Sequence, residues 1–141
     1  MSKLLLDSNF IIAIFRESEA DHDLAYRYCK SFLDDFECFV SNGVVSEVVT
    51  IVMMRTKSLD LTMNAFYFLK DNFVIVNEYE LDRFNDRVFS VFQKYNHDTF
   101  KLSFVDCSLV VIANALDLDY VVSFDKKFSL FEEIQLFVLS K

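Results

Sequence analysis

The sequence predicts an α/β fold, with a central, mainly parallel sheet of about five strands covered by helices on both faces. Short apolar runs alternate with segments of helical periodicity from one end of the 141-residue chain to the other. Strands separated by helices require right-handed crossovers, and these place the helices over both faces of a parallel sheet. One Gly, no Pro and 53% hydrophobic residues leave no linker, so residues 1–141 are expected to form one domain.

The first half of the chain should hold two strands and three helices. Three leucines predict a short buried strand, which Asp7 ends, and Ser41-Asn42-Gly43 supplies turn and N-cap chemistry for the third helix. The expected strands are 4–6 and a weak one at 37–40, and the expected helices are about 10–15, 21–32 and 43–54.

The second half continues the alternation, and its strongest helix signal begins after Ser103. A β-branched strand follows this helix and is ended by Asp125. The expected helices are 59–69, 81–95 and 104–116, and the expected strands are 73–76, 120–124 and 136–139.

The charge balance, 14 basic against 22 acidic residues, argues against a general nucleic-acid coat protein. It does not argue against a metal-dependent nuclease, because bound cations reverse the local sign of the charge. Three cysteines without CxxC spacing predict reduced thiols in a cytoplasmic protein, with Cys107 in a buried helix face. The apolar run at the start is too short for a signal peptide, and none approaches a membrane span of ~18 residues.

Four acidic residues are candidates for one site. Asp7 and Asp125 each follow a strand, and ligands of open α/β sheets bind beyond the carboxyl ends of strands. Asp106 lies in the first turn of the strongest helix, where the helix dipole favours an ionised carboxylate. Glu47 stands among valines, where an unbound acid is costly.

Each acid also has a purely structural interpretation. Asp7 could cap the helix that follows it, and Asp106 with Ser103 resembles a capping box. Asp125 could be an ordinary turn residue before two lysines, and Glu47 could face solvent. The convergence of all four on one sheet edge favours the functional interpretation.

Nearly the whole chain resembles the PIN-domain family, including VapC-like toxins. The resemblance rests on Leu-Leu-Leu-Asp7-Ser8-Asn9, on Ser46-Glu47-Val48, and on two C-terminal segments, Leu102-Ser103-Phe104-Val105-Asp106-Cys107 and Tyr120-Val121-Val122-Ser123-Phe124-Asp125-Lys126-Lys127-Phe128. It implies a three-layer α/β/α fold in which Asp7, Glu47, Asp106 and Asp125 bind Mg²⁺ or Mn²⁺, with Asn9 and Ser123 in support.

The implied function is metal-dependent hydrolysis of RNA phosphodiester bonds by the toxin of a type II toxin–antitoxin pair. An antitoxin partner and a homodimer are implied too, and the aromatic-rich helices between residues 59 and 95 offer apolar surface for the dimer. A non-catalytic PIN-like module that binds RNA or protein, or an RNA-processing nuclease without an antitoxin, remains an alternative. A haloacid-dehalogenase-like phosphatase needs an acid where Asn9 stands, and a receiver domain needs a first-strand acidic pair that is not evident.

Four basic residues near the predicted site are candidates for contacts to the RNA backbone: Arg16, Lys101, Lys126 and Lys127. For any one of them, solvated surface charge is the simpler interpretation. His22 and His97 lack ligand spacing, and the aromatic residues lie mostly at core spacing, so neither a histidine nucleophile nor a base-stacking platform is predicted.

Overall fold

The computed structural model describes residues 1–140 and confirms the α/β class. Its sheet has four strands, all parallel, in the order β3-β2-β1-β4. The strands are β1 (Lys3–Leu6), β2 (Glu37–Ser41), β3 (Val74–Val76) and β4 (Tyr120–Val122). Leu4 pairs with Cys38 on one side and with Tyr120 on the other, so β1 is an inner strand.

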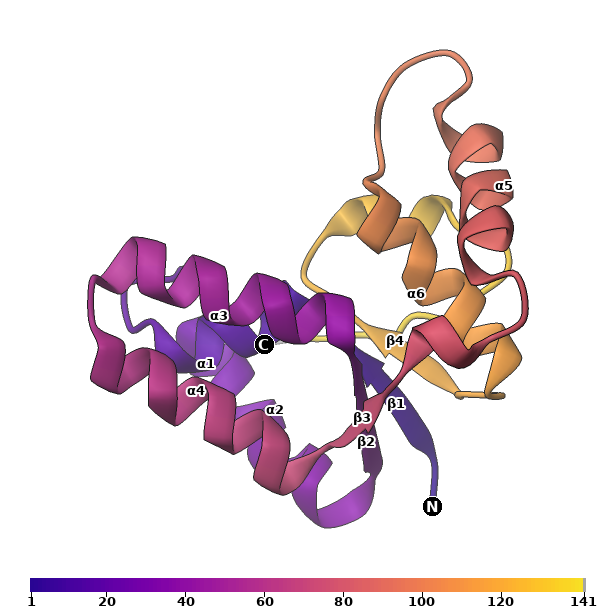
Figure 1. The fold of residues 1–141 in the computed structure, drawn as a ribbon. Coiled ribbons are helices and arrows are strands. Elements are labelled where there is room, and N and C mark those ends of the chain that lie inside the picture. The colour runs from indigo at the N-terminus through magenta and orange to yellow at the C-terminus, as the bar shows by residue number, and fades with distance from the viewer. Residues whose placement is uncertain (141) are drawn as a thin grey trace.

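The helices cover both faces of the sheet and confirm the three-layer arrangement (Figure 1). The crossovers from β1 to β2 and from β2 to β3 run in one direction along the sheet, and the crossover from β3 to β4 runs back. Right-handed crossovers in opposite directions lie on opposite faces, which separates the first four helices from the last two. The helices are α1 (Ser8–Phe15), α2 (His22–Asp35), α3 (Asn42–Thr56), α4 (Leu59–Asn72), α5 (Phe84–Asn96) and α6 (Phe104–Ala115), with short 3-10 helices η1 (Glu78–Glu80) and η2 (Lys126–Leu130).

Side-chain caps fix where several helices begin. The Ser41 hydroxyl accepts a hydrogen bond from the Val44 N–H, which confirms the predicted N-terminus of α3. Ser103 and Asp106 form the reciprocal bonds of a capping box at the start of α6. These local bonds satisfy N–H groups that have no partner within the helix.

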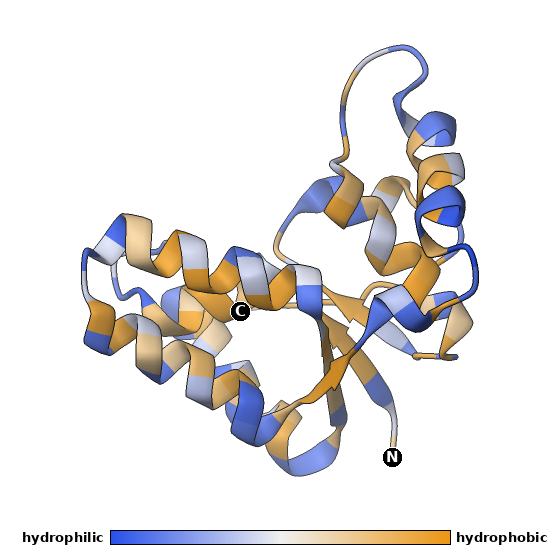
Figure 2. Cartoon of the chain, in the orientation of Figure 1, coloured by the Kyte–Doolittle hydropathy of each residue, from blue (hydrophilic) through white to orange (hydrophobic). Residues whose placement is uncertain are grey.

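The core lies along β1 and α6. Leu4, Leu5 and Leu6 are fully buried, which fits a central parallel strand covered on both faces. Figure 2 shows hydrophobic colour along much of the sheet. Cys107 is fully buried as predicted, and burial raises the pKa of its thiol to about 12. No helix within residues 1–140 combines the length and the apolar character that crossing a membrane requires.

The prediction of a fifth strand at 136–139 is wrong, because this segment does not form an extended strand. Only an isolated parallel bridge joins Leu136 to Val121. The Phe137 ring packs edge-on against Phe32, and Ser140 exchanges hydrogen bonds with the Tyr28 hydroxyl of α2. These contacts turn the chain from the sheet edge toward α2, so pairing stops after one bridge.

Two predicted boundaries also differ from the structure. The helix expected from residue 81 begins at Phe84, because the residues before it form η1 and carry Glu78 to the start of α3. The strand expected to reach residue 124 ends at Val122, because the Phe124 N–H donates to the Asn9 side chain instead of continuing the sheet.

Candidate functional site

The candidate site lies where the order of the sheet reverses. The chain moves from β1 toward β2 and β3 and then crosses to β4 on the other side of β1. Ligands of open α/β sheets bind outside the carboxyl ends of the strands at such a switch point. Asp7 follows β1 there, and its N–H donates to the Val122 carbonyl of β4 at 2.9 Å.

Three of the predicted acids come together at this point. Burial, with smaller contributions from the charges of Asp106 and Glu47, raises the pKa of Asp7 to about 7, although hydrogen bonds from Ser123 and Ser8 oppose the rise. Burial also raises the pKa of Glu47, and the charge of Asp106 adds to it. Asp7, Glu47 and Asp106 therefore form one electrostatically coupled group, the carboxylate cluster, carried by β1, α3 and α6.

Ser123 binds Asp7 directly and Asn9 is linked to it through Ser123, while their supporting role at a metal site stays a prediction. The Ser123 hydroxyl donates to Asp7 Oδ2 at 2.7 Å and accepts from Asn9 Nδ2 at 3.1 Å. Asn9 Oδ1 in turn accepts from the Phe124 N–H at 3.1 Å. The start of α1 and the end of β4 are thus locked together through side chains.

Asp7 and Asp106 each have a structural role as well as a place in the cluster. Asp7 is the N-cap of α1 and accepts from the Ser8 N–H at 2.8 Å. Asp106 Oδ2 accepts from the Ser103 N–H at 2.9 Å within the capping box. The capping and functional interpretations are therefore compatible, because each carboxylate is fixed by its cap while it faces the other acids.

Asp125 is held beside the cluster by its backbone. Its N–H donates to the Ser123 hydroxyl at 3.0 Å, but its carboxylate accepts from the Lys127 N–H at 2.9 Å and lies 3.9 Å from Lys127 Nζ. It is not among the charges that raise the pKa of Asp7 or Glu47. The turn interpretation of Asp125 describes this geometry, and its role as a metal ligand stays a prediction.

Two residues at the site, Ser8 and Glu78, were not among the predicted site residues. A hydrogen bond with the Ser8 side chain lowers the pKa of Glu47 against the effect of burial. Glu78, only 2% exposed, accepts from the N–H groups of Asn42 and Gly43 at 2.9 Å each and so caps the helix that carries Glu47. Nothing in the local sequence could indicate this, because Glu78 lies 35 residues from Gly43 along the chain.

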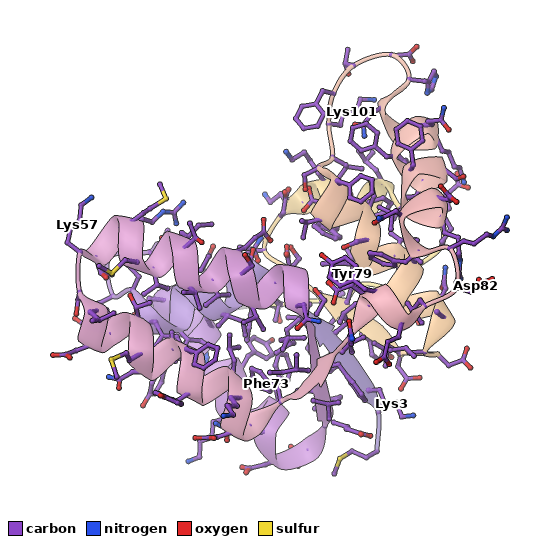
Figure 3. The ribbon with its side chains drawn as sticks, in the orientation of Figure 1. Lys3, Lys57, Phe73, Tyr79, Asp82 and Lys101 are labelled. Atoms are coloured by element: carbon purple, nitrogen blue, oxygen red, sulfur yellow. The ribbon has the colours of Figure 1, made fainter. Side chains whose placement is uncertain are left out.

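The four basic candidates have different surroundings. Arg16 Nη1 binds Glu19 at 2.8 Å, beyond the end of α1 opposite to Asp7. Lys101 is exposed on the loop between α5 and α6, where Figure 3 labels it. Lys126 is exposed at the start of η2, next to Asp125 and to the paired Lys127. Contacts of all four with RNA stay predictions.

The donor set of the carboxylate cluster fits a divalent cation. Within residues 1–140, no group of three or more His, Cys, Asp or Glu side chains is arranged so that it could hold a metal ion. Asp7 is nevertheless buried at 4% exposure beside two further acids, an arrangement that costs free energy unless a proton or a cation neutralises it. Carboxylate oxygens are hard ligands of the kind that Mg²⁺ and Mn²⁺ prefer.

The sequence model of the PIN-domain family matches residues 4–134, so the chain belongs to this family. The fold is similar to that of VapC20 from Mycobacterium tuberculosis, a sarcin–ricin loop cleaving toxin, with a TM-score of 0.73, 20% identity and coverage of 94% of this chain and 98% of that one. VapBC2 from Rickettsia felis, solved with a DNA fragment from its promoter, gives a TM-score of 0.74 at 12% identity, with coverage of 95% of this chain and 96% of that one. VapBC-1 from nontypeable Haemophilus influenzae gives 0.67 at 13% identity, covering 99% of each chain. No sequence among curated proteins matches this chain.

Proposed function

We propose that this chain is a Mg²⁺- or Mn²⁺-dependent endoribonuclease that acts in the cytoplasm as the toxin of a type II toxin–antitoxin pair. The observation that carries the proposal is the carboxylate cluster at the β1–β4 switch point. Membership of the PIN-domain family supports it, as do structural relatives described as a loop-cleaving toxin and as VapBC assemblies. RNA is then the substrate, and an antitoxin protein is the expected partner.

The residues have separable roles in this chemistry. Divalent cations stabilise the extra negative charge of the transition state in phosphodiester hydrolysis and lower the pKa of an attacking water. Asp7, Glu47 and Asp106 would hold the cation, and Asp125 is the predicted fourth ligand. Ser123 and Asn9 fix the orientation of Asp7, which is the task of hydrogen-bonding partners around a metal ligand.

One observation favours a second candidate, a non-catalytic PIN-like module that binds RNA or protein. The Asp125 carboxylate is occupied by its own turn and by Lys127. If this pairing persists, the site keeps three acids, a set that is able to bind a cation without completing the reaction. An RNA-processing nuclease without an antitoxin would use the same site, and only its substrate and partners would distinguish it.

The first experiment incubates the protein with tRNA and single-stranded RNA in Mg²⁺ or Mn²⁺, with EDTA as the metal-free arm. We expect cleavage that EDTA stops and that Asp7→Asn abolishes. The matched control is Asp71→Asn, an exposed acid on α4, which should cleave like the wild type. Metal binding without cleavage would favour the binding module, and absence of metal binding would reject the carboxylate site.

A further inference from the structure

A hollow of about 620 Å³ opens directly beside the candidate site. It lies between the start of α2, the turn after β4 and the C-terminal segment, and its lining includes Asp21, Leu24, Phe124 and Leu139. Ser123 and Asp125 line it as well, so it shares two residues with the site. Its volume is within the range of pockets that hold small ligands.

The wall of the hollow combines an apolar surface with a polar edge. Leu24, Phe124 and Leu139 provide apolar surface, and one side of the Phe124 ring is stacked on Phe10 with centroids 5.6 Å apart. At the edge, Asp21 is the N-cap residue of α2 but makes no side-chain cap hydrogen bond, so its carboxylate is not used by the helix. A supported aromatic ring beside hydrogen-bonding groups matches a flat, largely uncharged ligand with a polar rim.

The charges of the lining argue against a phosphate inside the hollow. The lining holds two carboxylates, those of Asp21 and Asp125, and one ammonium group, that of Lys126, while Lys127 Nζ lies outside the lining at 3.9 Å from Asp125. A phosphate would be repelled there, whereas a nucleobase brings no charge and its exocyclic amino group would donate to a carboxylate. The phosphate of the same nucleotide would remain outside, toward the carboxylate cluster and its cation.

We propose that this hollow binds the base of a nucleotide next to the phosphodiester bond that is cut, and that Asp21 favours bases with an exocyclic amino group. This inference rests on the proposed nuclease function, because it assumes that single-stranded RNA reaches the carboxylate cluster. It adds a specificity pocket formed by α2, the turn after β4 and the C-terminal segment. The pocket selects the base, while the cluster acts on the backbone.

The test fills the hollow with an indole ring. Ser129 is exposed and lines the hollow, whereas its exposed neighbour Leu130 does not, so Ser129→Trp and Leu130→Trp form a matched pair. The natural chain has no Trp, so the emission of the new indole reports whether it is shielded from water. Binding of labelled single-stranded cytidine and uridine oligomers is measured in EDTA, where metal-dependent cleavage cannot interfere.

We expect Ser129→Trp to have blue-shifted emission and to bind RNA about tenfold more weakly than the wild type, with Leu130→Trp unchanged. Unchanged RNA binding by Ser129→Trp with a shielded indole would overturn the pocket, and so would the absence of RNA binding by the wild type. Equal wild-type affinity for the cytidine and uridine oligomers, or a preference for cytidine that survives in Asp21→Ala, would overturn the role of Asp21. Because these measurements use no metal, they separate a failure of the pocket from a failure of cleavage.

Discussion

At the scale of single residues, the Ser123 hydroxyl makes hydrogen bonds to three other residues of the site. It has one proton, which it gives to Asp7, and its oxygen accepts from Asn9 and from the backbone of Asp125. Removing the hydroxyl therefore breaks the hydrogen bonds to the Asp7 carboxylate, to the Asn9 amide and to the backbone of Asp125 at the same time. The consequences should appear in metal binding before they appear in stability, because the bond to Ser123 lowers the pKa of Asp7 and so favours its ionised form.

We predict that Ser123→Ala weakens Mn²⁺ binding at pH 7 by about tenfold or more, the usual effect of losing a partner of a metal ligand. Ser123→Thr keeps the hydroxyl and serves as the control, with affinity close to that of the wild type. Isothermal titration calorimetry with Mn²⁺ measures both variants. Equal loss in the two variants would indicate a packing effect and contradict the role of the hydroxyl.

Asp7 should make the stability of the metal-free protein depend on pH. Burial raises its pKa to about 7 in the folded state, so its favourable contribution is complete below about pH 4 and is lost as the pH rises through 7. We expect Asp7→Asn to exceed the wild type in unfolding free energy by about 2–4 kcal/mol at pH 8 and to match it near pH 4. Urea unfolding in EDTA at the two pH values measures this, and a difference that does not vary with pH would contradict it.

From the sequence alone it could be predicted that Asp7, Glu47 and Asp106 gather at the β1–β4 edge, but not which hydrogen bonds each acid makes, and their catalytic role stays a prediction. Asp7 and Asp106 follow a strand end and a helix start, and both signals are local. The side-chain direction of Asp125 depends on its bonds to Lys127, whereas the hydrogen bond between Ser8 and Glu47 and the cap that Glu78 provides depend on tertiary contacts. Such contacts join distant segments, so no local pattern indicates them.

At the scale of elements, α3 depends on an acid from outside itself. Glu78 is buried and accepts from two N–H groups at the start of α3, where it also complements the helix dipole. A Cβ atom on Gly43 would lie 3.4 Å from Glu78 Oε2, so the one glycine of the chain stands where this carboxylate approaches the backbone. The same contact fixes the end of β3 relative to the helix that carries Glu47.

We predict that Glu78→Gln lowers the unfolding free energy by about 1–3 kcal/mol, because the amide replaces a charged double acceptor with one acceptor and one donor. Glu80→Gln, on the same 3-10 helix but exposed, is the matched control and should cost less than about 0.5 kcal/mol. Chemical denaturation followed by circular dichroism compares them. Equal effects of the two substitutions would argue against the cap.

Element positions could largely be predicted from the sequence, whereas several ends could not. Apolar runs located the helices α3, α4 and α6, and Ser caps were predicted for α3 and α6, since propensity and capping act within a few residues. The segment 136–139 has strand composition, yet Phe137 packs with Phe32 and Phe36, and pairing with β4 is reduced to one bridge. Side-chain packing across the molecule prevailed over local preference there.

At the scale of the whole molecule, an exposed apolar stripe on α4 offers a surface for the homodimer that the sequence predicts. Met63, Phe66 and Tyr67 are 44%, 38% and 49% exposed and lie on one helix face. We predict that the wild type is a dimer at micromolar concentration and that Met63→Glu with Tyr67→Glu makes it a monomer. Light scattering after size exclusion measures the mass, with Tyr26→Glu on α2, 67% exposed, as the control. A wild-type monomer across that concentration range would contradict the dimer.

The net charge of −8 limits how much of the RNA affinity can come from contacts with phosphates. Affinity that depends on phosphate contacts falls with salt at a slope of about −0.7 for each phosphate neutralised on a single strand. Arg16 pairs with Glu19 and Lys127 lies near Asp125, which leaves Lys101 and Lys126 as the exposed cations of the predicted set.

We therefore predict a salt slope of about −1 to −2 for RNA binding in EDTA. For Lys126→Ala, which loses one phosphate contact, we predict a slope that is less steep by about 0.7. Fluorescence anisotropy at several salt concentrations gives the slope; a value steeper than about −4 would require a basic RNA track that these residues do not form. A shallow slope in EDTA would mean that base contacts, rather than surface charge, account for the affinity.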